Sequence, residues 1–262
     1  MGDRVNPYIM ETCGECRYCA TRRENLCLTP GFISFSTGGG YAERVAVKAR
    51  NLIRIPDGVS YEEAAALQVA FATSWHMLFT RGNLRAGEKV MINSVGSGIG
   101  SAAVQLARIA GAYVIGNASS DEKLERAREL GMDAGINHAT DDVVARVMEL
   151  TDDRGVDLVY EHVGGELFQK GLDSLTKDGR MVICGAHSGE VVPFDIIPFF
   201  RTQRSVIGSF VYTREEVARC FDLAARGLIK PLVHQTFPLD DAGEALPTME
   251  RREHFGKLVL VP

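Results

Sequence analysis

Apolar and polar residues follow two different patterns along this chain, and the pattern changes between residues 60 and 90. Up to residue 60 the chain is rich in loop-forming residues, and the roughly alternating apolar and polar positions at 41–47 predict a strand. Ser60 and Glu63 have the spacing of a capping box, and residues 64–67 after them favour a helix. A second helical stretch is predicted at 74–80. The first 60 residues are therefore expected to form a small β-rich lobe.

From residue 89 onward, short apolar runs alternate with amphipathic stretches of helical spacing. Strands are predicted at 90–92, 113–115, 156–160, 181–184 and 205–210, and helices at 99–109, 123–130, 143–150, 167–175 and 215–226. Because such strands are joined by right-handed crossovers, this alternation predicts an α/β fold with a parallel sheet covered on both faces. After Pro231 the chain is expected to return to the β-rich lobe, with a strand at 257–261.

Composition narrows the function mainly by exclusion. The chain has 262 residues and a formal net charge of −5, which gives no basic field for a nucleic-acid partner. No apolar stretch approaches the roughly 20 residues of a membrane-spanning helix, and the first residues are polar, unlike a secretory signal. The composition predicts a cytoplasmic protein that acts on a small-molecule substrate, with no membrane and no nucleic acid as partner.

Four cysteines near the start of the chain are closely spaced: Cys13, Cys16, Cys19 and Cys27. Zinc prefers a tetrahedral set of sulfur ligands, and four protein ligands leave no vertex for water or substrate, so the spacing predicts a structural zinc site. Two disulfides are the competing interpretation, and an iron–sulfur cluster is a minor one. Zinc is favoured because disulfides are typical of secreted chains and this chain is large enough to need no covalent staple.

A glycine-rich turn joins the predicted strand at 90–92 to the helix after it. The turn contains Gly96, Ser97, Gly98, Ile99 and Gly100. At a strand–turn–helix junction, backbone N–H groups and the helix dipole stabilise a pyrophosphate, so these five residues are predicted to bind a dinucleotide. The spacing departs from G-x-G-x-x-G, because Ser101 stands five residues after Gly96. The alternative is a turn that needs glycine only for its positive φ angles.

The second strand of the predicted sheet bears on the choice between NAD and NADP. An NAD site has an acidic residue about 20 residues after the glycine turn, and counting would select Asp121. The strand is expected to end near Gly116, and Asp121 then lies within a predicted capping box formed by Ser119 and Glu122. We therefore reject Asp121 as the ribose ligand.

The predicted tip of this strand carries hydroxyls and a lysine instead of an acid. Ser119, Ser120 and Lys123 suit the additional phosphate of NADP, which a carboxylate would repel. NADP is therefore favoured over NAD. The alternative is that Lys123 is a solvated side chain on a helix.

In combination, these motifs resemble the medium-chain dehydrogenase/reductase superfamily, in its zinc-type alcohol dehydrogenase and quinone reductase group. The resemblance covers the whole chain, and its markers are the cysteines and residues 2–5, 39–43, 64–78, 94–100, 129–131, 155–157 and 255–257. It implies a doubly wound Rossmann domain, a GroES-like β-rich catalytic lobe with a structural zinc loop, and homodimers or homotetramers. The domains are then expected at 1–60 for part of the lobe, 61–229 for the Rossmann domain and 230–262 for the return to the lobe.

The resemblance also implies roles for further residues. Those expected near the nicotinamide are Thr73, Ser209 and Phe210, those beside the cofactor are Gly185 and Ala186, and Asn137 is expected near the adenosine end. Reductases of the family often have tyrosine where this chain has His138. Among the histidines, only His162 and His187, at the predicted carboxyl ends of strands, are candidates for the site. No catalytic residue is assigned.

Two departures from the family pattern affect the expected chemistry. In the family, Gly-Asp-Arg-Val follows several barrel strands, which carry a cysteine and a Gly-His-Glu motif that supply the first ligands of the catalytic zinc. Here this motif begins at Gly2, so the lobe is expected to be incomplete, with the missing strands encoded in frame upstream or their edges protected by association. Val69 aligns with the remaining zinc-ligating cysteine, and valine cannot bind zinc.

Three functions follow from these observations. The first is NADPH-dependent reduction of a small carbonyl, enone or quinone without a catalytic zinc. The second is a zinc-dependent alcohol dehydrogenase, which Val69 argues against. The third is a non-catalytic nucleotide-binding fragment of such an enzyme.

Overall fold

The computed structural model describes residues 2–36 and 38–262, which divide into two compact units. The first unit contains the residues up to Thr73 together with Phe210–Pro262, and the second contains Ser74–Ser209. The two units are defined by compactness and do not test domain boundaries, so the boundaries expected after residues 60 and 229 stay predictions. Each unit is described by itself below.

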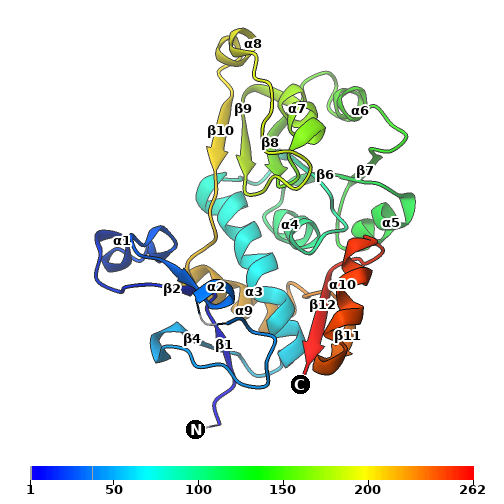
Figure 1. Cartoon of the computed structure of the whole chain (residues 1–262). Coiled ribbons are helices and arrows are strands. Elements are labelled where there is room, and N and C mark those ends of the chain that lie inside the picture. Colours follow the sequence, from blue (N-terminus) through cyan, green and yellow to red (C-terminus); the bar gives the residue numbers. More distant parts are fainter. Residues whose placement is uncertain (1, 37) are drawn as a thin grey trace. The chain divides into compact units, whose positions relative to one another are not determined.

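The second unit is built on a parallel sheet of six strands, as far as its described residues go (Figure 1). The strands are β5 (Lys89–Ile92), β6 (Tyr113–Ala118), β7 (Ala134–Asn137), β8 (Val156–Glu161), β9 (Leu175–Ile183) and β10 (Ser205–Gly208). Their order across the sheet is β10-β9-β8-β5-β6-β7, and every neighbouring pair is parallel. The order reverses between β5 and β8, as in a doubly wound Rossmann fold, which confirms the predicted fold class.

Helices connect these strands and cover the sheet. They are α4 (Gly98–Ile109), α5 (Asp121–Glu129), α6 (Val143–Leu150), α7 (Gly165–Asp173) and α8 (Ile196–Arg201). Helix α6 begins where predicted because the Asp142 carboxylate accepts the N–H groups of Val144 and Ala145, at 3.0 and 3.1 Å. One fully buried side chain from each of five strands forms the core beneath the helices, namely Met91, Ile115, Ile136, Val159 and Met181.

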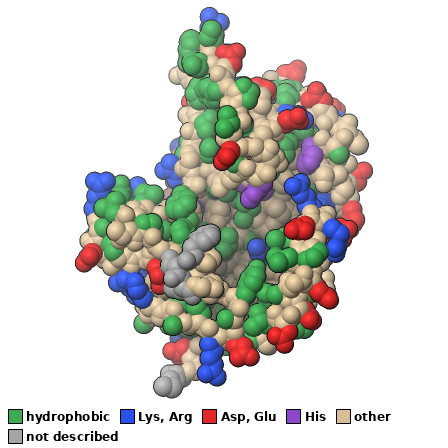
Figure 2. Space-filling view, in the orientation of Figure 1, with side chains coloured by type: hydrophobic (Ala, Val, Ile, Leu, Met, Phe, Trp, Pro, Cys, Tyr) green, Lys and Arg blue, Asp and Glu red, His purple; other side chains and the backbone are tan. Residues whose placement is uncertain are grey.

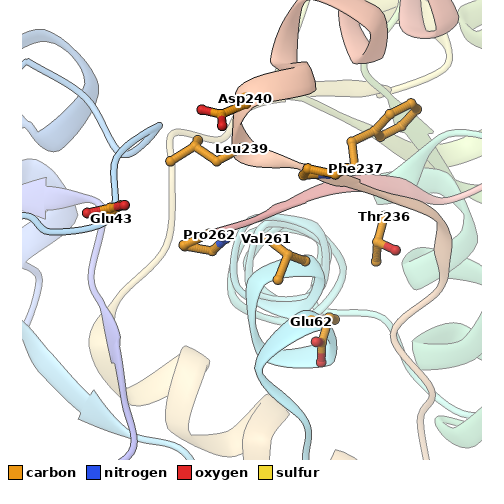
Figure 3. Close-up of a pocket in the computed structure, with 9 residues that line it drawn as sticks. Glu43, Glu62, Thr236, Phe237, Leu239, Asp240, Val261 and Pro262 are labelled. Carbon is orange, nitrogen blue, oxygen red and sulfur yellow. The ribbon is translucent and has the colours of Figure 1, made fainter.

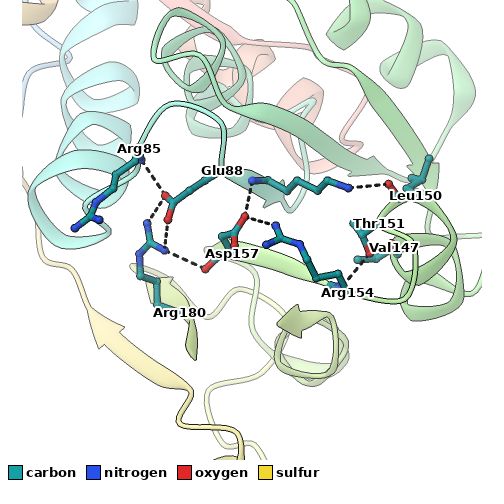
Figure 4. A network of polar contacts seen from close by, with 10 residues as sticks. Arg85, Glu88, Val147, Leu150, Thr151, Arg154, Asp157 and Arg180 are labelled. Carbon is teal, nitrogen blue, oxygen red and sulfur yellow. Dashed lines mark hydrogen bonds and ion pairs between the residues drawn. The ribbon is translucent and has the colours of Figure 1, made fainter. Parts of the chain in front are cut away.

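A polar network fixes the starts of the central strands (Figure 4). The Arg180 guanidinium binds both carboxylate oxygens of Glu88, at 2.7 and 3.1 Å, and also donates to the Asp157 carbonyl at 3.2 Å. The Asp157 carboxylate accepts the N–H of Lys89, the first residue of β5, at 2.8 Å, and the Arg154 guanidinium at 2.7 Å. Bidentate contacts of this kind position strands, so the amino ends of the sheet serve stability and leave the carboxyl ends for ligands.

The first unit is formed by short paired strands and helices. Antiparallel pairs join β1 (Val5–Pro7) to β4 (Leu52–Arg54) and β2 (Met10–Glu11) to β3 (Gly31–Phe32), while β11 (Val233–Pro238) and β12 (Lys257–Val261) are parallel. The helices are α1 (Arg17–Ala20), α2 (Ile33–Ser36), α3 (Tyr61–Trp75), α9 (Arg214–Ala225) and α10 (Ala242–Glu250). Short helical turns of this unit are η1 (Glu24–Leu26), η2 (Ala49–Asn51) and η4 (Leu239–Asp241). The π-helical η3 (His76–Arg81), which follows α3 along the chain, belongs to the second unit.

Gln68 on α3 connects distant segments of the first unit. Its side-chain oxygen accepts the Ile9 N–H at 3.0 Å and the Tyr212 hydroxyl at 3.2 Å, and its amide donates to the Pro7 carbonyl at 2.8 Å and to Asn6. Gln68 is buried, so each unmade hydrogen bond would carry a desolvation cost. This side chain therefore fixes the first strand and the segment before α9 against α3.

Several local predictions are confirmed. The Ser60 N–H donates to the Glu63 carboxylate at 2.9 Å and the Glu63 N–H to the Ser60 hydroxyl at 3.1 Å, which is the predicted capping box. Strand β12 has the predicted bounds, and α9 is followed by Gly227 at a φ of +70°.

A search of the described residues for a membrane-spanning helix finds none that is long and apolar enough.

Three local predictions are wrong. Residues 41–47 pair with no strand in the described part of the chain and are mostly exposed, because alternation makes a strand only where a hydrogen-bonded neighbour exists. Strand β6 continues past Gly116 to Ala118, since its partner β7, which was not predicted, pairs with it to that point. Helix α5 is capped by Ser120, whose hydroxyl accepts the Lys123 N–H at 3.4 Å, and not by a box of Ser119 and Glu122.

Candidate functional site

The four cysteines of the predicted zinc site meet at one point. Their Sγ atoms all lie within 4.8 Å of one another, with 3.6 Å between Cys13 and Cys27 and 3.8 Å between Cys13 and Cys19. All four are free thiols. A tetrahedron with zinc–sulfur bonds of about 2.3 Å has edges of about 3.8 Å, so these separations fit a zinc ion. The quartet is therefore able to hold zinc, and the disulfide interpretation has no support in the geometry.

Backbone N–H groups already point at these sulfurs. The Cys16 N–H donates to Cys13 Sγ and the Cys13 N–H to Cys27 Sγ, each at 3.3 Å. The N–H groups of Cys19 and Leu28 lower the pKa of Cys16 to about 6, whereas burial, with the neighbouring thiols, raises the pKa of Cys19 to about 12. A cation bound at the quartet would favour the ionised form of all four thiols and would release their protons.

The glycine-rich turn lies between β5 and α4, so it leads directly into the N-terminus of a helix. Ser97 caps α4, and its hydroxyl accepts the Gly100 N–H at 2.9 Å. Within the described turn from Ser94 to Gly100, only Ser94 has a positive φ, of 50°. A Cβ at position 100 would lie 2.2 Å from the Ser94 carbonyl oxygen. Glycine is thus needed at 100 for close packing, and the interpretation of a turn that requires only positive φ angles does not account for it.

Hydrogen-bonded side chains lie at the carboxyl ends of four adjacent strands. The Asn117 amide donates to Asn93 Oδ1, the Asn93 amide donates to the Glu161 carboxylate, and His138 Nδ1 lies 3.1 Å from Asn117 Oδ1. We call these four residues the strand-end network. Asn117 Oδ1 also accepts the Ser94 N–H at 3.2 Å, so the network holds the glycine-rich turn in place.

Sequence reasoning missed Asn93 and Glu161 as parts of this site. Asn93 directly follows the apolar run of β5 and Glu161 ends β8 after three apolar residues, and this was the available signal. Glu161 is fully buried and accepts the Gly164 N–H at 2.7 Å as well as the Val163 N–H. Burial raises the pKa of Glu161 although these donors oppose the shift. Its carboxylate fixes the loop between β8 and α7.

Burial lowers the pKa of two histidines at this edge. Burial, assisted by Lys170 and Lys123, lowers the pKa of His138. Burial, assisted by His187, lowers the pKa of His162 to about 3. His162 is 3% exposed, and its Nε2 lies 3.1 Å from the Ser97 hydroxyl oxygen. Of the two histidines singled out in the sequence, His162 therefore contacts the glycine-rich turn directly.

Other predicted residues also lie at the carboxyl edge. A Cβ on Gly185 would be 2.7 Å from the His162 carbonyl oxygen, so the loops after β8 and β9 pack backbone against backbone with Ala186 next in the chain. The Ser209 hydroxyl oxygen is buried without a hydrogen-bond partner among the described residues. A buried hydroxyl of this kind is expected to meet a ligand or water, and the role of Ser209 near the nicotinamide stays a prediction.

The end of β6 shows how the candidate adenosine residues are arranged. Ser119 is exposed, Ser120 caps α5, and Lys123 is half-buried on the first turn of that helix. The Asn137 amide donates to the Asp121 carboxylate at 3.0 Å, so the one acidic residue that counting had selected is bound to the end of β7.

Thr73 and Phe210 belong to the first unit. Thr73 is buried in α3, and Phe210 is 53% exposed, with its ring 6.2 Å from that of Phe32. These two assignments, like the other residue roles taken from the sequence, stay proposals.

A cavity of about 500 Å³ in the first unit involves different residues (Figure 3). It is lined by Glu43, Glu62, Thr236, Phe237, Pro238, Leu239, Asp240, Val261 and Pro262. It shares no residue with the predicted metal or cofactor sets, and its three acidic side chains would repel a pyrophosphate. We therefore do not assign it as the cofactor site.

Two family descriptions match the chain. Residues 98–226 match "Zinc-binding dehydrogenase", and residues 1–57 match "Alcohol dehydrogenase GroES-like domain". An alcohol dehydrogenase of Geobacillus stearothermophilus is 34% identical over 262 residues, covering 99% of this chain and 76% of that protein. A quinone oxidoreductase of Pseudomonas aeruginosa is 31% identical, covering 88% of this chain and 74% of that protein.

A solved structure described as an NAD-dependent alcohol dehydrogenase has the same fold. Its TM-score is 0.95 at 34% identity, and the match covers 100% of this chain and 76% of that one. Both the paired-strand unit and the parallel-sheet unit therefore have counterparts in known proteins.

Proposed function

The chain belongs to the medium-chain dehydrogenase/reductase superfamily, in its zinc-binding alcohol dehydrogenase and quinone reductase group, and we propose that it reduces a small carbonyl, enone or quinone with NADPH. As a member it is an NAD(P)-dependent oxidoreductase. The cofactor, when bound, supplies the hydride, and the protein supplies binding, orientation and polar stabilisation. The choice of NADPH rests on the side chains that follow the end of β6.

At that end, the residues directly after the strand carry hydroxyls and no carboxylate. Ala118 closes the strand, Ser119 and Ser120 follow it, and Lys123 lies on the next helical turn. The Asp121 carboxylate accepts a hydrogen bond from Asn137. Hydroxyls and an ammonium group favour the phosphate of NADP, whereas the NAD-dependence named for the compared structure would call for a carboxylate.

The proposed reduction uses no catalytic zinc. Val69 aligns with a cysteine that binds the catalytic zinc in the zinc-type alcohol dehydrogenases that this chain resembles. Val69 lies on α3, is 40% exposed, and has no atom that can bind a metal. Zinc held by the cysteine quartet would have four protein ligands and therefore no vertex for substrate. Polar groups would then have to stabilise the charge that develops on the substrate oxygen.

A zinc-dependent alcohol dehydrogenase is the second candidate, since two relatives that match 99% of this chain are alcohol dehydrogenases. The test is loss of NADPH absorbance with methyl vinyl ketone, a small quinone and an aldehyde, against reduction of NADP and NAD by ethanol. Turnover of the enone or quinone, unaffected by added zinc, is expected. Zinc-dependent oxidation of ethanol would support the second candidate instead, and cofactor binding without any turnover would indicate a non-catalytic fragment.

We also propose that the protein forms homodimers or homotetramers. Strand β10 is an edge strand that pairs only with β9 within the described sheet, and Ser205–Gly208 contains no charge or proline that would block a second strand. Figure 2 shows hydrophobic side chains gathered over α8, where Ile196, Ile197 and Phe200 are each more than half exposed. Sedimentation equilibrium tests this proposal, and a monomer at micromolar concentration would contradict it.

The proposed compartment is the cytoplasm. All six cysteines are free thiols, which is typical of a reducing environment.

A further inference from the structure

The Ser97 hydroxyl has two hydrogen-bond neighbours in its own chain. Its oxygen accepts the Gly100 N–H at 2.9 Å as the cap of α4, and His162 Nε2 lies 3.1 Å away, at the end of the neighbouring strand β8. A serine hydroxyl has one proton and can accept two hydrogen bonds. The direction of the serine proton therefore depends on which nitrogen of His162 carries its own proton.

The surroundings of the second ring nitrogen of His162, Nδ1, determine which tautomer is the more stable. Its Nδ1 is buried without a hydrogen-bond partner among the described residues, and the side chain is 3% exposed. With the proton on Nδ1, a buried N–H would lack an acceptor, which is rare in folded proteins. With the proton on Nε2, that N–H donates to Ser97 and only a lone pair is left unpaired. The second tautomer is therefore the more stable one.

We propose that His162 is a positioning residue that donates from Nε2 to Ser97, so that the Ser97 hydroxyl proton is directed to a phosphate oxygen of the bound dinucleotide. Both acceptor sites of the hydroxyl are then occupied by Gly100 and His162, and its proton must be donated outward. Ser97 is half-buried, unlike His162, so part of its surface is open to a ligand. This inference rests on the proposed dinucleotide function.

A phosphate oxygen is the expected acceptor of the Ser97 hydroxyl proton, because this hydroxyl lies at the N-terminus of a helix. Ser97 stands at the start of α4, a helix of 12 residues whose first N–H groups and dipole favour an anion. The strand-end network holds the turn through the Ser94 N–H, which keeps the hydroxyl at a fixed position. The pyrophosphate is common to NADH and NADPH, so His162 is expected to support both equally, in contrast to Lys123.

Two amide variants distinguish the effect of losing the Nε2 hydrogen-bond donor from the effect of losing the packing of the ring. The Gln side chain of His162→Gln places an N–H near the position of Nε2, whereas that of His162→Asn is one methylene shorter and reaches only the position of Nδ1. Both remove the same ring, so a stability loss that comes from packing should appear in both. Thermal unfolding midpoints measure that shared loss.

The measurement is the dissociation constant of NADPH, NADH and adenosine 2′-monophosphate, which has no pyrophosphate. His162→Asn is expected to weaken NADPH and NADH by the same factor of about tenfold, the scale of one hydrogen bond to a charged group, and to leave the monophosphate unchanged. His162→Gln should stay within about twofold of the wild type for all three. Equal loss in both variants, or no loss in either, would overturn the inference.

The tautomer is read directly from ring-nitrogen chemical shifts of ligand-free protein labelled with ¹⁵N-histidine. A proton on Nε2 of His162 supports the inference, and a proton on Nδ1 overturns it even if NADPH binds. A wild-type protein that binds neither NADPH nor NADH would overturn the proposed function and the inference together. The two failures are therefore distinguishable.

Discussion

The Asn93 side-chain amide donates a hydrogen bond to the Glu161 carboxylate, and this contact joins the ends of β5 and β8. These are the neighbouring strands at which the strand order reverses, where open α/β sheets bind their ligands. Asn93 also accepts from Asn117, and Glu161 also accepts from the backbone of the following loop. The donor and acceptor pattern is therefore fixed at both ends of the contact.

Exchange of the two side-chain chemistries tests this pattern. Glu161→Gln places an amide N–H against the Asn93 donor, and Asn93→Asp places a carboxylate against Glu161. Each is expected to lower the free energy of unfolding by about 2–4 kcal/mol, because a buried polar group loses its partner. The double variant, which combines the two substitutions, should recover most of that loss, since the introduced glutamine can then donate to the introduced aspartate. Urea unfolding of all four proteins gives the coupling energy, and additive losses would contradict the assigned contact.

The cofactor preference depends on Lys123. Lys123→Ala should weaken NADPH binding by about tenfold through loss of a charged hydrogen bond to the phosphate, and should change NADH binding by less than about twofold. Lys177→Ala is a matched control, because Lys177 is an exposed lysine near the start of β9, at the opposite end of that strand from the site. Isothermal titration measures both nucleotides. Equal weakening of NADH and NADPH would show that the NADP assignment is wrong.

Much of the parallel-sheet unit could be predicted because its signals are local. The apolar run before Asn93 and the amphipathic run after Ser97 each indicate one element, and their alternation indicates the topology. Residues 41–47 show the limit of such reasoning, since alternation describes a side-chain pattern and says nothing about whether a strand partner exists. Strand β7 was missed for the opposite reason. It is a short edge strand with Gly135 inside it, and its pairing with β6 alone defines it.

The proposed zinc site can be tested by metal content and thermal stability, without an activity assay. The purified wild-type protein should contain about one zinc ion per chain, and Cys16→Ser should contain far less, because a hydroxyl is a poor replacement for a thiolate ligand. The thermal midpoint should fall by about 5 °C or more, since 1 kcal/mol shifts a domain of this size by about 2–4 °C. Elemental analysis and calorimetry measure these two quantities.

Cys220→Ala is the control for that experiment. Cys220 is a fully buried thiol on α9, outside the quartet, so its removal should leave the zinc content unchanged. Two zinc ions per wild-type chain would contradict the proposal that the quartet holds the only zinc.

The candidate site was less predictable than the fold, because its contacts join residues that are distant in sequence. Cysteine spacing alone indicated the metal quartet, since all four ligands fall within one short segment. In contrast, Asn93 and Glu161 are separated by 68 positions, and their pairing depends on the adjacency of β5 and β8. His162 could be placed at a strand end, but its contact with Ser97 required the sheet order.

Protonation of His162 gives the protein a specific dependence of stability on pH. The pKa is about 3 in the folded protein and near the ordinary 6.5 after unfolding, so between these values the unfolded chain binds more protons. The contribution of this group to the free energy of unfolding is therefore complete above pH 6.5 and is lost as the pH falls toward 3. The slope in this window should approach about 1.4 kcal/mol per pH unit.

Comparison with variants that cannot titrate isolates this contribution from those of Glu161 and His138. Urea unfolding between about pH 4.5 and pH 8 should show that the stability advantage of the wild type over His162→Gln shrinks as the solution becomes more acidic. His162→Asn should give the same pH-dependent difference, since neither amide titrates, whatever each does to the contact with Ser97. Because that contact affects ligand binding and not the number of protons taken up, the two variants should differ in NADPH affinity and agree in their pH profiles. A difference that stays constant with pH would show that His162 is not held uncharged by burial.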